Sequence, residues 1–460
     1  MQKTVVINIV GLTSNLLNKN LPFLNQWIAK GKLCKIKPML PAVTCSVQST
    51  YLTGEWPNIH GIVGNGWYFQ DVCEIKFWHQ SNKLVTAPKI WEVAKKQDPS
   101  FTCANMFWWY NMYSTVDYSV TPRPIYAADG RKIQDCYTSP INLRDELQKK
   151  LGKFPLFNFW GPNASIKSSK WIAESSKVVE AKYNPTLTLI YLPHLDYCLQ
   201  KSGINSKETT KSLKELDDVC KDLINFYENK NANVIVLSEY GIEPVNHVVY
   251  INKILRQNGY LNIREENGGE LLDTGTSLAF AVCDHQVAHV YIKDKTIISK
   301  ISKLLSTIKG IDIVIQNSEK EKYKLNHQRS GDLIVVANES SWFSYYYWLD
   351  DKKAPDFAQI VEIHKKPGYD PAELFIDPTI RWAKLRILLT LLKKKLGFRY
   401  LMKYIPLNAN LVKGSHGRIN TDPKNYPIIV SQKKNILTKN YIEAIEVFNI
   451  LKDHLELERK

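Results

Sequence analysis

Several features that would place the chain outside the ordinary globular enzymes are missing from its sequence. No window holds the uninterrupted apolar run of about 20 residues that a membrane-spanning helix needs. The N-terminus, MQKTVVINIVGL, reads as a strand and lacks the basic start, long apolar stretch and small-residue cleavage site of a signal peptide. The eight cysteines are scattered and form no CxxC pair, which argues against a disulfide framework. We therefore expect a cytoplasmic protein with reduced thiols.

Internal repeats, low-complexity segments and recognised nucleic-acid-binding modules are also missing. The 460 residues are enough for a large core, and their composition is that of an ordinary globular protein. The formal charge of +16 favours anionic partners. We expect a small phosphorylated substrate, and we do not expect nucleic acid, because the aromatic residues suited to base stacking lie far from the basic segment in the sequence.

That basic segment is concentrated in residues 381–403, where lysines and arginines are interleaved with Leu, Ile, Trp and Phe. Such a charge run is most often the solvated face of a helix. The alternative is an amphipathic helix that rests on an anionic membrane surface. The second interpretation would make the cytoplasmic protein membrane-associated.

Three continuous apolar runs predict central strands that are buried on both faces: Thr4–Val10, Thr186–Leu192 and Asn233–Leu237. Helical patterns separate these runs, which predicts an α/β fold with a mostly parallel sheet. After Gly268 short strands and a Lys-rich helix alternate quickly. We therefore expect an α/β core in residues 1–268, an inserted α+β lobe in 269–340, and a return to the core in 341–460 that includes the basic helix and a C-terminal helix from Tyr441 to Leu457.

Thr44 marks the stretch around which these elements are organised. It follows the predicted strand Leu33–Leu40 and precedes a short predicted helix, Val47–Thr53, that Gly54 closes. A hydroxyl at a helix N-terminus suits an oxyanion or phosphate oxygen. It also suits plain capping, which is the commoner role. Loops rich in glycine and proline, like the one that follows here, often carry function.

Further polar residues come at the ends of the predicted parallel strands. Asp196 follows the second of these strands and Glu239 follows the third, so both lie at the sheet edge that also receives Thr44. The aromatic run Phe107–Tyr113 is most simply core packing. The alternative is that Trp108 and its neighbours form one wall of a substrate pocket.

The order of these pieces resembles the alkaline phosphatase superfamily, and within it the type I phosphodiesterase/nucleotide pyrophosphatase family. Residues 41–68, PAVTCSVQSTYLTGEWPNIHGIVGNGWY, are similar to the family's nucleophile turn, its Thr-Gly-x-x-Pro-x-x-His-Gly-Ile segment and a following Asn. Residues 191–196 (YLPHLD), 237–241 (LSEYG) and 415–417 (SHG) resemble three later motifs. The resemblance spans about residues 3–430 and is most specific from Thr53 to Ile62.

The resemblance implies an α/β/α sandwich that carries two divalent metal ions, usually zinc, and a Thr or Ser nucleophile. By position, Thr44 is the nucleophile, Asp196 and His416 are ligands of one metal, and Glu239 is a ligand of the other. Two close cations can bind the attacking and leaving oxygens of an in-line phosphoryl displacement. The implied reaction is hydrolysis of a phosphoester or pyrophosphate bond through a covalent phospho-enzyme.

Five positions depart from the family pattern. Val10 replaces the Asp of the first strand, and Gln200 replaces the His four residues after the motif Asp. Glu239 and Tyr240 replace an Asp-His pair, and Val47 replaces an Asn after the nucleophile. Val cannot bind a metal, and Gln and Tyr are poor zinc ligands at neutral pH. We therefore expect an atypical metal site that holds one ion rather than two, or none.

Three arrangements remain open for this site. In the first, one metal binds at Asp196, Glu239 and His416, with His194 as an additional ligand. In another, the fold binds a phosphorylated or lipid-linked metabolite without metal chemistry, at a membrane surface.

In the remaining arrangement, other side chains form the metal site in place of the lost ligands. One set is His364 with Asp370, although His364 is most simply a surface residue. The other is Asp284, His285 and His289, of which the histidines are most simply strand-associated residues. Weak substrate-binding roles are assigned to four residues: His194, Gln200, Tyr240 and Trp108.

Overall fold

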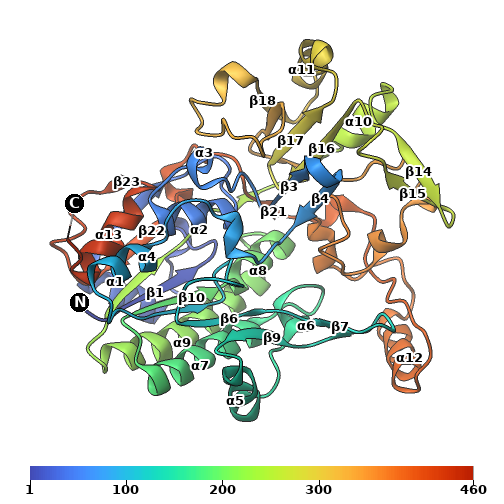
Figure 1. Cartoon of the computed structure of the whole chain (residues 1–460). Coiled ribbons are helices and arrows are strands. Elements are labelled where there is room, and N and C mark those ends of the chain that lie inside the picture. The colour runs from blue at the N-terminus through green and yellow to red at the C-terminus, as the bar shows by residue number, and fades with distance from the viewer. Residues whose placement is uncertain (459–460) are drawn as a thin grey trace.

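The computed structural model describes residues 1–458 and is built around one large sheet (Figure 1). Its nine strands, in spatial order, are β23 (Tyr441–Glu443), β2 (Lys32–Lys37), β22 (Ile428–Ser431), β11 (Asn233–Leu237), β1 (Thr4–Ile9), β10 (Leu187–Leu192), β5 (Cys103–Met106), β6 (Tyr118–Pro122) and β9 (Cys136–Ser139). The strands from β11 to β6 are parallel neighbours, whereas β22 and β9 run antiparallel to theirs. The predicted mostly parallel α/β sheet is confirmed.

Helices cover both faces of this sheet, as an α/β/α sandwich requires (Figure 1). On one face α7 (Ile166–Tyr183) and α9 (Lys207–Glu228) pack together and against β10 and β11, with α1 (Pro22–Lys30) beside α9. On the other face α2 (Thr44–Thr53) packs against α13 (Glu446–Leu455). Further helices are α3 (Pro57–His60), α4 (Ile90–Gln97), α5 (Asn142–Leu151), α6 (Leu156–Phe159) and α8 (His194–Ser202).

A second, antiparallel sheet lies beyond the main one. Its order is β16 (Ala279–Asp284), β17 (Val287–Ile292), β19 (Leu333–Ala337) and β18 (Ile311–Ile315), and α11 (Ile298–Ser306) packs against β18. Every residue of β16 and β17 is buried, and most of their apolar residues share a core with aromatic residues of the segment 342–348. The division into 1–268, 269–340 and 341–460 stays a prediction.

The remaining strands form short pairs. Among residues 1–458 these are β3 (Gly66–Phe69) with β4 (Glu74–Phe77), β7 (Ile125–Tyr126) with β8 (Lys132–Ile133), β12 (Glu243–Pro244) with β21 (Gly414–Ser415), β13 (His247–Val249) with β20 (Ser341–Phe343), and β14 (Ile263–Glu266) with β15 (Gly269–Leu272). Two more helices are α10 (Ile251–Gln257) and α12 (Ala383–Lys395).

The C-terminal helix differs from its prediction. It begins at Glu446 rather than Tyr441, because residues 441–443 pair with β2 as the edge strand β23. The eight cysteines are free thiols, six of them buried. In the described part of the chain, no helix is long and apolar enough to cross a membrane.

The buried side chain of His60 holds the segment after α2 in place through hydrogen bonds. Gly54 and Gly61, the residues after α2 and α3, have φ angles of 71° and 79°, in the left-handed region that glycine adopts readily. Between them His60 is fully buried. Its Nε2 lies 2.9 Å from the Thr50 hydroxyl, and its Nδ1 accepts a hydrogen bond from the backbone N–H of Ile62. Burial, with smaller contributions from the charges of His327 and Arg329, lowers the pKa of His60 to about 3.

This buried histidine makes the protein sensitive to acid. Because the pKa of His60 is about 3 in the folded chain and about 6.5 in the unfolded chain, only the unfolded chain binds the proton between these values. Stability is therefore lost as pH falls below about 6.5. At pH 5 the expected loss from His60 is about 2 kcal/mol relative to pH 7.5. Urea unfolding at the two pH values measures it, and H60Q should lose about 2 kcal/mol less than wild type. Equal pH dependence would contradict this assignment.

Candidate active site at the carboxyl edge of the sheet

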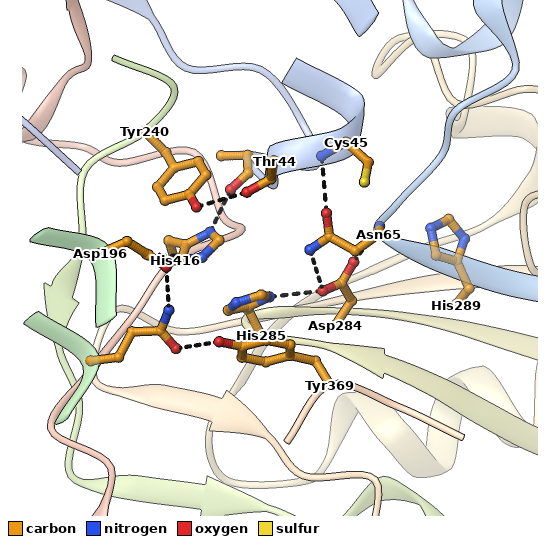
Figure 2. A network of polar contacts seen from close by, with 12 residues as sticks. Thr44, Cys45, Asn65, Asp196, Tyr240, Asp284, His285, His289, Tyr369 and His416 are labelled. Atoms are coloured by element: carbon orange, nitrogen blue, oxygen red, sulfur yellow. Dashed lines mark hydrogen bonds and ion pairs between the residues drawn. The ribbon is translucent and has the colours of Figure 1, made fainter. Parts of the chain in front are cut away.

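Thr44 is the first residue of α2, and its hydroxyl faces the protein interior. The residue before the helix is Val43, and no side chain caps the helix. The Thr44 hydroxyl instead lies 2.9 Å from the hydroxyl of Tyr240, which follows β11 (Figure 2). The capping role, which local sequence alone favoured for Thr44, is therefore wrong. All ten residues of α2 are buried, so the positive end of the helix acts in a dry environment.

His416 lies between Tyr240 and Asp196. Its ring stacks on the Tyr240 ring with centroids 3.6 Å apart and an interplanar angle of 7°. Its Nδ1 lies 2.7 Å from the carbonyl oxygen of Ala42, to which it donates a hydrogen bond. Burial lowers the pKa of His416 well below its usual range, so the ring is neutral. The tautomer is thereby fixed, and Nε2 carries a lone pair.

That lone pair faces a carboxylate oxygen. Nε2 of His416 lies 3.8 Å from Oδ1 of Asp196, which belongs to α8. Both atoms are buried and have no hydrogen-bond partner. Burial raises the pKa of Asp196 to about 7, although the Gln200 amide and the Tyr240 hydroxyl oppose the shift. Two acceptor atoms that face each other in a dry site call for a proton or a cation between them.

Glu239 directly precedes Tyr240 in the chain. Its Oε1 accepts hydrogen bonds from the side-chain amides of Asn8 on β1 and Gln48 on α2, whereas its Oε2 is buried without a partner. Burial raises the pKa of Glu239 to about 8, and the shift is opposed by Gln48, Asn8 and the Thr44 hydroxyl. The Gln48 amide is itself held by the backbone N–H of Trp109. Each of the three predicted ligands thus keeps one buried polar atom without a partner.

Gln200 and Tyr369 tie Asp196 to the second sheet. Gln200 lies one helical turn after Asp196, and its Nε2 donates a hydrogen bond of 3.0 Å to Asp196 Oδ2. Its Oε1 accepts a hydrogen bond of 2.8 Å from the hydroxyl of Tyr369. The Tyr369 ring in turn stacks on His285, with centroids 3.6 Å apart. Gln200 therefore links Asp196 on α8 to the segment that packs against the turn after β16.

The turn after β16 closes the site from the other side (Figure 2). His285 Nδ1 lies 2.7 Å from Asp284 Oδ1, and the His285 ring lies 3.8 Å from the ring of His416. The Asp284 carboxylate accepts hydrogen bonds from the backbone and side-chain amides of Asn65. Asn65 Oδ1 accepts one from the N–H of Cys45. Burial raises the pKa of Asp284 to about 6, although its bonds to Asn65 oppose the shift.

Other predicted residues lie elsewhere. His194 approaches Glu215 on α9, with Nε2 to Oε2 at 3.6 Å. His289 forms hydrogen bonds with the carbonyl of Val63 and the N–H of Gly331. These contacts agree with the simpler interpretation of His289 as a structural, strand-associated residue. Trp108 is fully buried in the main core.

The second sequence-based pair, His364 with Asp370, is not assembled as a site. Asp370 is ion-paired to buried Lys366, and His364 is exposed, with its Nδ1 near the carbonyl of Phe77. Sequence reasoning missed the roles of Asn8, Gln48 and Tyr369. The polar Asn8 within an otherwise apolar strand was the one available signal.

Several positions of the predicted metal site offer no free donor atom. Val10 is an apolar core residue, and the side chains of Gln200 and Tyr240 are engaged in the contacts described above. Within residues 1–458 no group of three or more His, Cys, Asp or Glu side chains is arranged to hold a metal ion, so Asp196, Glu239 and His416 are not brought together as the predicted ligand set. The facing atoms of Asp196 and His416 are the pair that a single cation could join.

A family model for type I phosphodiesterase / nucleotide pyrophosphatase matches residues 4–370. The chain belongs to this family. It is 24% identical over 255 residues to an uncharacterised pyrophosphatase/phosphodiesterase of Schizosaccharomyces pombe, covering 53% of this chain and 44% of the relative. It is 26% identical over 278 residues to ectonucleotide pyrophosphatase/phosphodiesterase 1 of Saccharomyces cerevisiae, covering 53% and 34%. The matched part is thus less than half of each curated relative's length.

Solved structures show the same fold at low identity. Murine ectonucleotide pyrophosphatase/phosphodiesterase 5 superimposes with a TM-score of 0.58 at 14% identity, covering 99% of this chain and 96% of the other. Phosphonoacetate hydrolase from Sinorhizobium meliloti superimposes with a TM-score of 0.59 at 12% identity, covering 98% and 96%. The family member thus has the alkaline-phosphatase-like fold that the sequence predicted.

Proposed function

We propose that this family member hydrolyses a phosphoester or pyrophosphate bond in a small anionic substrate, with Thr44 as the nucleophile. The observation that carries the proposal is the place of the Thr44 hydroxyl. It is not used as a cap, it begins a buried helix, and it lies beside Tyr240 and Glu239. An inactive variant of murine ectonucleotide pyrophosphatase/phosphodiesterase 5, in which a threonine is replaced by alanine, was solved in complex with AMP. A nucleotide-like phosphate ester is accordingly the first substrate class to test.

The residues of this chain supply most of the steps. The positive end of α2 attracts the phosphate group. The Tyr240 hydroxyl holds the Thr44 oxygen in position, and Glu239 is placed to accept the Thr44 proton. The Thr44 oxygen attacks phosphorus, the bond from phosphorus to the leaving oxygen breaks, and water then hydrolyses the phosphothreonine.

A single divalent cation held by Asp196 and His416 is part of the proposal. Histidine nitrogen and carboxylate oxygen are donors that suit zinc. Bound there, such an ion would offset the negative charge that develops on the phosphoryl group. The fixed tautomer of His416 supports this assignment, because its hydrogen bond to Ala42 leaves Nε2 free for a ligand bond.

A second candidate is a catalytically inactive family member that binds a phosphorylated or lipid-linked metabolite. The observation that favours it is the hydrogen-bonded network of Gln200 and Tyr369, which occupies one predicted ligand position and closes the site. Thr44 and His416 are 3% and 1% exposed. A site with fixed amide contacts of this kind can hold a ligand without metal chemistry.

Metal stoichiometry separates these candidates. After incubation with zinc or manganese and desalting, elemental mass spectrometry should find about one metal per wild-type chain and none in D196A/H416A, because the ion loses both donors. The variant H194A/E215A removes another histidine–carboxylate pair, outside the site, in which the histidine is buried and the carboxylate is partly exposed, and should keep the metal. A metal-free wild-type chain would favour the inactive candidate, and equal loss in both variants would reject the assignment to Asp196 and His416.

A further inference from the structure

The helix α12 lies on the surface of the protein and turns its apolar side toward solvent. None of its 13 residues is buried, and it lies apart from both sheets (Figure 1). Thr390 lies on the side of α12 that faces the protein, where its hydroxyl is 2.8 Å from the hydroxyl of Tyr404. Ala383, Ile387 and Lys394, which share that side at helical spacing, are the less exposed residues. The rest of the helix therefore faces outward.

The outward face is apolar. Leucines recur at intervals of three and four residues, which places them on one side of the helix, opposite Thr390: Leu385, Leu388, Leu389, Leu392 and Leu396. Each of them is at least half exposed, and Leu388 and Leu396 reach 62% and 64%. Large aromatic side chains extend this surface at both ends of the helix, namely Trp382 at 69% and Phe398 at 64% exposure.

Positive charge borders this leucine face on both sides. At 100° per residue, Lys384 and Lys395 lie along one border and Arg386 and Lys393 along the other. From residue 378 to residue 421 the sequence has no Asp or Glu. In the described chain, no lysine or arginine of α12 makes an ion pair. The charges are therefore free to meet an external anion.

We propose that α12 lies in the plane of an anionic membrane surface, with its leucine face among the acyl chains and its lysines and arginines at the lipid phosphates. A partner protein would need an apolar groove with an acidic rim on both sides. A bilayer with anionic lipids offers that chemistry along the whole helix. A helix of 13 residues is too short to span the bilayer. This inference does not depend on the proposed hydrolysis.

Vesicle flotation of the full chain tests the proposal. Wild type should float with vesicles of phosphatidylcholine and phosphatidylglycerol, and about tenfold less with phosphatidylcholine alone. L388E/L392E should lower binding to the anionic vesicles about tenfold or more. The control I141E/L349E places two acidic side chains at exposed apolar positions elsewhere, 85% and 50% exposed, and should bind like wild type.

Three results would overturn the proposal. They are wild type that floats with neither vesicle, L388E/L392E that binds like wild type, and I141E/L349E that loses binding equally. If wild type ignores vesicles but is a dimer by light scattering, and L388E/L392E is a monomer, the leucine face pairs with a second copy instead. Binding to anionic vesicles that K393Q/K395Q weakens about tenfold supports the role of the basic border.

Discussion

Replacing Thr44 by alanine is expected to lower the hydrolysis of a p-nitrophenyl phosphodiester by about a thousandfold or more. The alanine variant loses the γ-methyl together with the hydroxyl, so it has no oxygen that can attack phosphorus, and the loss of a nucleophile removes a covalent path that other groups do not replace. The fold should persist, because the helix α2 has no cap that depends on Thr44. The measurement is the steady-state rate of p-nitrophenol release by metal-loaded protein.

The control for this prediction is T44S, which keeps the hydroxyl and its bond to Tyr240 and should retain measurable turnover. The thermal midpoints of T44A and wild type should be compared, so that loss of activity is not confused with unfolding. An alanine variant with wild-type turnover would contradict the assignment of Thr44 as nucleophile, whatever the metal content.

Replacing Lys366 by methionine is expected to destabilise the protein by about 3–5 kcal/mol. The Lys366 ammonium is 1% exposed and pairs with Asp370 at 2.8 Å and with Glu373 at 2.7 Å, both of them buried. Methionine would fill the space but would leave two buried carboxylates without a counter-charge. The same loop carries Tyr369, which contacts Gln200 and His285, so local opening would also disturb the candidate site.

Chemical denaturation measures the free energy of unfolding of K366M relative to wild type. The matched control is K365M, which changes the exposed neighbour and should alter stability by no more than about 0.5 kcal/mol. If K366M were as stable as K365M, the buried ion pairs would not be holding this loop.

The main sheet was predictable because its central strands are continuous apolar runs. Residues 4–10 and 186–192 could hardly be anything but buried strands in a chain of this composition. Its edges were harder, because β23 has only three residues and its first, Tyr441, is exposed. A short half-exposed strand has too few residues for an alternating pattern, and its register depends on a neighbour far away in the sequence.

The candidate site was predictable in part, and the limit is set by long-range contacts. Thr44, Asp196 and His416 follow strands or lie in motifs, so their gathering at one edge could be anticipated from topology. The helix was predicted to begin at Val47, whereas α2 begins at Thr44 itself, because the sequence does not show which of residues 43–46 precedes the first turn. The contacts of Asn8 with Glu239 and of Tyr369 with Gln200 join segments more than 160 residues apart. No local sequence pattern predicts such contacts.

The most direct test of the proposed function is to look for the phosphoryl group on Thr44. Metal-loaded wild type is mixed with the p-nitrophenyl phosphodiester, quenched in acid during turnover and digested, and the peptide that contains Thr44 is examined by mass spectrometry. A mass increase equal to the transferred phosphoryl group, localised to Thr44 and missing in T44A, is the predicted result. Turnover with an unmodified Thr44 at every quench time would contradict the account.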